Sequence, residues 1–163
     1  MYKKMFSLSF AIMFCFLVTN LQAQNKKDMS KTKMSMKNVY GAMLSGKNVV
    51  PPVKTKAYGK ASFTFSKDGK SLHYELMVYH VDSVMMAHIH HAPAGKNGPI
   101  AVWLYKGKVT KKVNGLLSQG TITNKTVNLD SLRTWMNNGD AYVLVHTKKY
   151  PGGEIRGIIK HSK

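Results

Sequence analysis

From Val39 onward the chain consists of short runs in which apolar and polar residues alternate, with turn residues between them. Phe63 and Phe65 share one side of an extended chain, and every second residue from Leu72 to Val78 is apolar or aromatic. Such alternation is typical of strands that bury one face, so the pattern predicts an all-β fold, a sandwich or a barrel. The predicted strands are residues 39–46, 60–66, 72–81, 85–91, 100–105, 120–123, 141–147 and 153–160.

A tight turn is predicted between the second and third of these strands. Its sequence is SKDGKS, and the pair Asp68-Gly69 suits a hairpin turn that requires positive φ angles. The two flanking strands should therefore be antiparallel neighbours.

One segment has the spacing of a helix. In NLDSLRTWMNNGD, residues 128–140, apolar residues recur every three or four positions. Asn128 or Asp130 could cap its start, and Gly139 suits the left-handed residue that follows a helix end. We expect this helix to cover an open end of the sheet.

The N-terminal residues have the pattern of a secretory signal. Lys3 and Lys4 precede an apolar run from Phe6 to Val18, and Ala23 is a small residue suited to cleavage. That run is shorter than the roughly 20 residues that a membrane-spanning helix needs. We therefore expect an exported protein, periplasmic or extracellular, with no transmembrane segment after cleavage.

The predicted organisation is a signal peptide (1–23), a flexible linker rich in lysine and methionine (24–38) and one folded domain (39–163).

The chain is strongly basic. Its formal charge is +18, and the loss of Lys3 and Lys4 with the signal leaves 18 − 2 = +16. A charge of this size attracts polyanions, so acidic polysaccharide or an anionic membrane surface is a candidate partner, as is a protein ligand. Nucleic acid is not expected as the partner of an exported protein. The other interpretation is that dispersed lysines only keep the domain soluble.

Three histidines in the stretch MMAHIHH raise the question of a metal. His88 and His90 point to the same face of a strand and His91 to the other, and His146 lies in a distant strand. Three imidazoles from His88, His90 and His146 would suit copper or zinc as a cofactor. The only cysteine, Cys15, lies in the predicted signal. The alternative is that these histidines donate hydrogen bonds to carbonyls of neighbouring loops.

The chain resembles the CHRD (chordin-type) domain family. The resemblance lies in the stretch from Leu44 to Val81, in AHIHHAPAGKNGPIAVWLY and in GDAYVLVHTKKYPGGEIRGII. It implies an antiparallel, immunoglobulin-like Greek-key sandwich with one short helix before the penultimate strand, and it implies no reaction. One departure is Leu144, where the family commonly has asparagine, which puts polar contacts around His146 in question.

A second resemblance is to the sandwich of copper-zinc superoxide dismutase. It would make His88, His90 and His146 metal ligands and Arg156 an anion contact. The loop HAPAGKNGP supplies only His91 as a further ligand, so the sequence does not predict a complete dismutase site. The structural interpretation of Arg156 is an exposed or interstrand ion pair with Glu154, on the same strand face.

The sequence leaves three functions open. The first is a binding module of the CHRD type, without evident catalytic machinery, for a metal, a polyanion or a protein. The second is a copper- or zinc-binding protein with a redox or metal-handling role. The third is a structural component of the cell envelope. No nucleophile, base and acid fall into a recognisable set, so an enzyme is not predicted.

Overall fold

The computed structural model describes residues 22, 24, 26, 27, 29, 38–107 and 111–162. The chain divides into two units, Met1–Lys37 and Asn38–Lys163. In the first unit the five described residues are helical. Apart from these five residues and Asn38, the predicted signal peptide and linker lie outside the described residues. No helix within the described part of the chain is long and apolar enough to cross a membrane.

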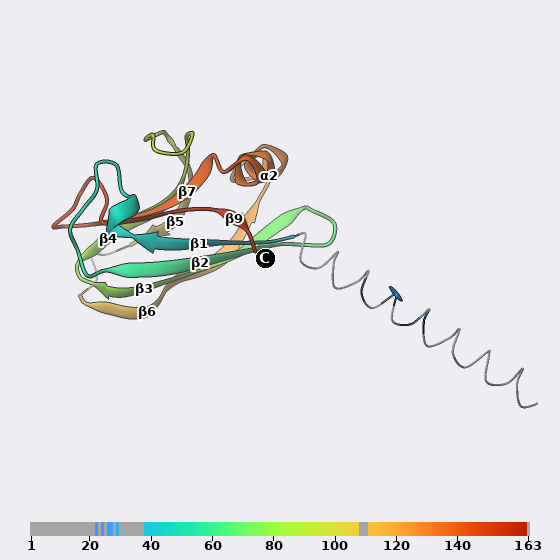
Figure 1. Ribbon diagram of the computed structural model, residues 1–163, viewed down its shortest axis with the longest axis horizontal. Coiled ribbons are helices and arrows are strands. Elements are labelled where there is room, and N and C mark those ends of the chain that lie inside the picture. The colour runs from blue at the N-terminus through green and yellow to red at the C-terminus, as the bar shows by residue number, and fades with distance from the viewer. Residues whose placement is uncertain are drawn as a thin grey trace, which may run out of the picture. The chain divides into compact units, whose positions relative to one another are not determined.

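The second unit is a single, strongly curved antiparallel sheet (Figure 1). Its strand order is β5-β4-β7-β8-β1-β2-β3-β6, and β9 pairs with β1. The strands are β1 (Val39–Ser45), β2 (Tyr58–Phe65), β3 (Ser71–Val81), β4 (Val84–His91), β5 (Ile100–Lys106), β6 (Val113–Thr123), β7 (Ala141–Thr147), β8 (Ile155–Ile158) and β9 (Lys160–His161). A 3₁₀ helix, η1 (Gly46–Asn48), follows β1, and α2 (Leu129–Asn138) precedes β7. The predicted all-β sandwich is confirmed.

The two edge strands of the sheet approach each other and nearly close it. Tyr74 of β3 donates its hydroxyl hydrogen to the carbonyl of Leu104 in β5 at 2.8 Å, and the Ser118 hydroxyl of β6 donates to the same carbonyl at 2.5 Å. These side chains take the place of ladder hydrogen bonds between β5 and β6. The sheet therefore surrounds one core.

The core occupies the inner face of the sheet. Phe63 and Phe65 of β2 and Leu72 and Leu76 of β3 are buried there, as their alternation predicted. Apolar residues of α2 join the same core, so the helix covers the sheet as expected. The Asn128 side chain accepts a hydrogen bond from the Ser131 backbone N–H, which makes Asn128 the cap rather than Asp130.

Two local predictions need correction. The β2–β3 hairpin exists, but only Gly69 has a positive φ (72°), while the Asp68 carboxylate accepts from the Ser66 hydroxyl and the Lys70 N–H. Strand β6 begins at Val113 instead of Gly120. Its first half was missed because it is half exposed and carries a glycine, Gly115, at φ 136°, so no clean alternation marks it.

Candidate metal centre

The pairing of β4 with β7 sorts their side chains between two faces. Ala87 lies opposite Val145 and Ile89 opposite Val143, and these four residues belong to the inner core. The residues between them point to the outer face of the sheet. His88 and His90 of β4 and His146 of β7 are therefore brought together on that outer face, as the sequence predicted.

His91 points the other way, as strand alternation requires. Its ring stacks on Trp135 of α2, with ring centroids 4.1 Å apart and planes 14° from parallel. It takes no part in the cluster of His88, His90 and His146, which is hereafter called the histidine triad.

Three covering loops bury the outer face around the triad: residues 46–57, 92–99 and 148–154. They are joined to one another. Asn97 donates to the Val50 carbonyl at 2.7 Å, and the Thr55 hydroxyl donates to the Glu154 carboxylate at 2.6 Å. Beneath them the triad residues are between 1% and 8% exposed, although they lie outside the main core.

Two carbonyl groups of these loops fix the tautomers of two triad residues. Nδ1 of His90 is 2.9 Å from the Gly98 carbonyl, and Nδ1 of His146 is 2.9 Å from the Pro151 carbonyl. Because a carbonyl can only accept, each neutral ring carries its hydrogen on Nδ1. Each Nε2 is then left with an unprotonated lone pair, the form that binds a metal.

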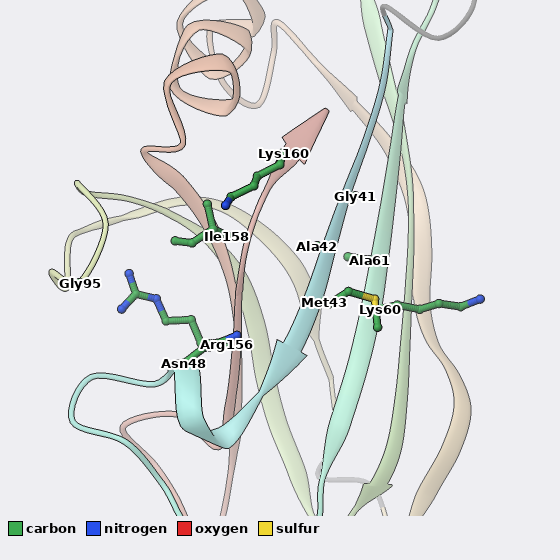
Figure 2. Close-up of a pocket in the computed structure, with 10 residues that line it drawn as sticks. All are labelled: Gly41, Ala42, Met43, Asn48, Lys60, Ala61, Gly95, Arg156, Ile158 and Lys160. Atoms are coloured by element: carbon green, nitrogen blue, oxygen red, sulfur yellow. The ribbon is translucent and has the colours of Figure 1, made fainter. Parts of the chain in front are cut away.

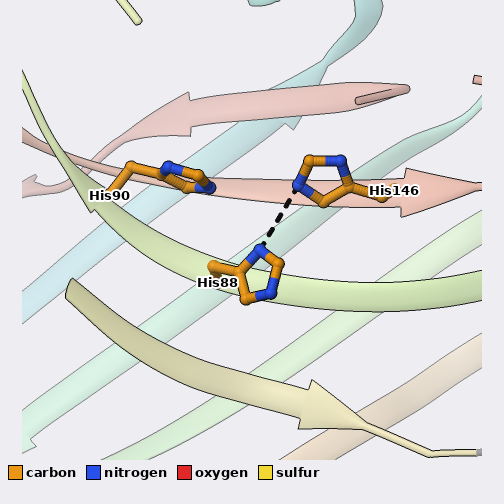
Figure 3. A group of neighbouring side chains, drawn as sticks. All are labelled: His88, His90 and His146. Carbon is orange, nitrogen blue, oxygen red and sulfur yellow. Dashed lines mark hydrogen bonds between the residues drawn. The ribbon is translucent and has the colours of Figure 1, made fainter. Parts of the chain in front are cut away.

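The third histidine, His88, contacts His146. Nδ1 of His88 is 3.3 Å from Nε2 of His146, and because that Nε2 accepts, the His88 Nδ1 is the donor (Figure 3). Nε2 of His88 and Nε2 of His90 are buried, and no described residue gives either of them a hydrogen-bond partner. Buried polar atoms of this kind are costly and uncommon in folded proteins.

The surroundings keep all three imidazoles neutral. Burial, together with the neighbouring His146 and His90, lowers the pKa of His88 to about 4. Burial also lowers the pKa of His90 and of His146, although their hydrogen bonds to Gly98 and Pro151 act in the opposite direction. Neutral imidazole is the form that coordinates copper or zinc.

The separations suit a shared ion. One donor nitrogen from each of the three residues lies within 4.8 Å of the other two. Two nitrogens bound at about 2.0–2.1 Å to one tetrahedral ion stand about 3.3 Å apart, which matches the 3.3 Å between His88 Nδ1 and His146 Nε2. For both atoms to bind the ion, the hydrogen of His88 would move from Nδ1 to Nε2, and the metal would replace the hydrogen bond between the two rings. The wider separations would close with a shift on the order of 1 Å, so the geometry is compatible with metal binding.

Arg156 lies next to the triad, but not as an exposed ion pair. It is 1% exposed, and its guanidinium carbon lies 3.7 Å from the centroid of the Tyr142 ring. The Glu154 carboxylate instead accepts hydrogen bonds from the hydroxyls of Thr55 and Thr147. The predicted Glu154–Arg156 pair is wrong, because Glu154 accepts from two threonine hydroxyls and Arg156 donates to the Lys96 carbonyl, partners that sequence alternation does not reveal.

Sequence reasoning missed the residues that hold the triad in place. Tyr142 stacks on His90 with centroids 5.1 Å apart and planes 8° from parallel, and its hydroxyl accepts from the Gly98 N–H. Only the register of β4 with β7 places it there, and that register is not readable from the sequence. The departure at Leu144 leaves the polar contacts of His146 intact, because its partners are His88 and the Pro151 carbonyl.

The fold and the site together define an all-β sandwich with a buried triad of neutral histidines on its outer face. The CHRD domain family matches residues 40–159, which include both histidine strands, so the chain belongs to the CHRD family. The resemblance noted in the sequence is thereby confirmed. A search of curated proteins gives no match.

Proposed function

We propose that this protein is an exported binding module that holds one copper or zinc ion through His88, His90 and His146. The observation that carries the proposal is the orientation of the rings. Two loop carbonyls hold Nδ1 of His90 and His146, so that Nε2 of each ring carries a lone pair, and at His146 a metal would take the place of the hydrogen that His88 Nδ1 donates. Three neutral imidazoles form a nitrogen site that leaves a position for water or another ligand.

The alternative role, in which the histidines only tie loops to the sheet, accounts for part of this geometry. It explains the bonds of His90 and His146 to Gly98 and Pro151. It does not explain His88, which contacts no loop carbonyl among the described residues and keeps a buried, unpartnered Nε2. A loop-tying role would also not require the donor atoms of all three rings to converge.

The proposal is tested by titrating the metal-free protein with Cu²⁺ and with Zn²⁺ in separate calorimetric experiments. We expect one high-affinity equivalent. His88→Ala, His90→Ala and His146→Ala should each weaken binding by at least about ten-fold. The matched controls are His91→Ala, from the same strand, and His73→Ala, from the exposed face of β3, and both should bind as the unaltered protein does.

Circular dichroism of each variant separates a lost ligand from a lost fold. Intact spectra with lost binding support the metal site. A folded, unaltered protein that binds neither ion contradicts it, as does equal weakening by His91→Ala.

A second candidate function is contact with a polyanion, favoured by the charge of the covering loops. Exposed lysines lie in all three of these loops, whereas their one carboxylate, Glu154, is buried against two threonine hydroxyls. The lysines are Lys47, Lys54, Lys56, Lys96, Lys148 and Lys149. Binding to heparin should weaken steeply as salt rises, and a Lys148→Gln/Lys149→Gln variant should elute earlier than a Lys67→Gln/Lys70→Gln control. Equal elution of the two variants would show that heparin binding reflects only the general positive charge of the protein.

Export is proposed from the signal pattern in residues 1–23. The intact mass of the exported protein should correspond to a chain that begins at Gln24. An uncleaved or lipidated product would contradict this.

A further inference from the structure

The side chain of Arg156 has donors that nothing in the described chain uses. Its Nη2 donates to the Lys96 carbonyl at 2.8 Å, whereas Nε and Nη1 are buried without a hydrogen-bond partner among the described residues. A buried guanidinium normally has its N–H groups satisfied and its charge balanced. Contact with the Tyr142 ring offsets only part of this cost.

A pocket of about 660 Å³ lies against this guanidinium. Figure 2 shows Arg156 reaching from β8 toward the turn at Gly95, with Ile158 and Lys160 farther along the same side. The charged side chains that line the pocket are Arg156, Lys60 and Lys160, and none of its described lining residues is a carboxylate. The remaining lining is largely aliphatic. The pocket therefore combines cationic groups with apolar walls.

We propose that this pocket binds a small organic carboxylate. The carboxylate would accept hydrogen bonds from the unused donors of Arg156, whose planar guanidinium matches a carboxylate. Lys160 would add a second positive charge, and a short apolar body would lie against Ile158 and Met43. Because Nε and Nη1 are covered, groups around the guanidinium must move to admit the ligand, and the turn at Gly95 and Lys96, whose Lys96 carbonyl accepts from Nη2, is a neighbouring segment that can do so. The side of this turn on which a Gly95 side chain would lie is open, with no atom within 4 Å of the added carbon.

This site is separate from the histidine triad. Tyr142 lies on β7, which has β4 on one side and β8 on the other. His90 of β4 stacks on its ring, and Arg156 of β8 contacts the same ring. The carboxylate would bind Arg156 and the metal would bind the three histidines, so no residue is a ligand of both, and the two proposals can be tested with separate variants.

Gly41 offers a way to block the pocket without disturbing the fold. A side chain added at Gly41 would meet only the Ser162 hydroxyl at 3.6 Å and the Ala61 carbonyl at 3.7 Å, which are ordinary contacts. Gly41 lines the pocket on β1, so Gly41→Val places two methyl groups in the space that the ligand's apolar body would occupy. Valine also suits a strand position.

The test is a titration of the exported protein with sodium butyrate, followed by amide NMR. We expect saturable shifts at Gly95, Ile158 and the Arg156 Nε–H. Gly41→Val and Arg156→Lys should each weaken binding on the order of ten-fold, and Lys160→Gln by a few-fold. The matched control Lys70→Gln, an exposed lysine in the β2–β3 turn, should change nothing. His88→Ala, which removes a ring that faces Trp103 and His146, should also leave butyrate binding unchanged, even if it removes metal binding.

Inorganic phosphate serves as the comparison anion, because it has charge but no apolar body. Weaker binding of phosphate, insensitive to Gly41→Val, supports the proposal. Three results would overturn it: no saturable shift with butyrate, shifts spread over lysines remote from the pocket, or equal binding by Gly41→Val. Because Gly41→Val and Lys160→Gln leave Arg156 in place, the test stands even if Arg156→Lys does not fold.

Discussion

The two faces of strand β4 are buried to nearly the same degree but with opposite energetic consequences. Ala87 and Ile89 face the inner core, where removal of apolar surface from water stabilises the fold by about 25 cal/mol per Å². His88 and His90 face outward under the covering loops and are also less than one tenth exposed. Their burial removes polar nitrogens from water, and the Nε2 of each ring has no hydrogen-bond partner among the described residues.

The hydrogen bonds of His90 and His146 to loop carbonyls favour their burial, but no contact among the described residues offsets the burial of Nε2 in His88 and His90. An apolar side chain at His88 would avoid the cost of its unpartnered Nε2, whereas one at His90 would leave the Gly98 carbonyl without its partner. The inner face therefore maintains the sheet, while the outer face brings three neutral imidazoles together. Because strand alternation separates the two sets of side chains, substitutions can affect one without the other.

The largest difference in the free energy of unfolding is expected between a substitution on the inner face and one on the outer face. Ile89→Ala should lower the free energy of unfolding by about 2–5 kcal/mol, because it leaves a cavity in the inner core. His88→Leu should change it by less than about 1 kcal/mol in the metal-free protein. It removes one unpartnered nitrogen, leaves His146 Nε2 without its partner and adds apolar contact. Urea unfolding at neutral pH measures both.

Met43→Ala is the control for shortening a side chain. Because Met43 is 72% exposed, this substitution should change the free energy of unfolding little. If His88→Leu destabilises the metal-free protein as much as Ile89→Ala does, the triad is part of the structural core and the distinction between the faces is wrong.

An intermediate effect is expected from pH. The unfolded chain takes up protons on its histidines near pH 6.5, whereas His88 in the fold does so only near its lowered pKa of about 4. Between these values the unfolded state binds more protons, so the metal-free protein loses stability as pH falls. The shift of His88 corresponds to roughly 3 kcal/mol across this window. The lowered pKa values of His90 and His146 act in the same direction.

Urea unfolding at pH 7 and at pH 4.5 measures this loss. The His88→Leu variant should lose clearly less stability over the same interval. A pH dependence that is unchanged in this variant would show that other groups cause it, and that His88 is not held neutral by its surroundings.

How far the sequence predicts this molecule depends on which interactions are local. The alternation around Phe63 and Phe65, the helix spacing before Gly139 and the shared face of His88 and His90 follow from chain geometry alone. The first half of β6 could not be predicted in this way. It lies at a sheet edge where Leu116 is 49% exposed, so packing against β3, not an apolar pattern, makes it a strand.

The candidate site shows the same limit. Its three histidines could be predicted from their motifs. The carbonyl groups that orient two of them could not, because these belong to Gly98 and Pro151 in loops of no regular pattern. Arg156 was misplaced for the same reason. Its Nη2 donates to the Lys96 carbonyl, which is 60 residues away in sequence. Backbone groups carry no sequence signature, so only the tertiary structure shows which side chains they fix.

The smallest effect, and the most specific, is expected from the loop glycines that hold the triad. A side chain at Gly98 would overlap the His91 carbonyl oxygen, so Gly98→Ala must displace the loop and with it the carbonyl that holds His90 Nδ1. Loss of such a supporting hydrogen bond typically weakens metal binding about 10- to 100-fold. Gly152→Ala is the matched control, because Gly152 also lies in a covering loop but has no atom within 4 Å of the added carbon. Zn²⁺ titration of the two variants should therefore separate them, with Gly152→Ala binding as the unaltered protein does. Unchanged affinity in a folded Gly98→Ala variant would mean that the Gly98 carbonyl does not orient His90 for a metal, and the loop contact would then serve the fold alone.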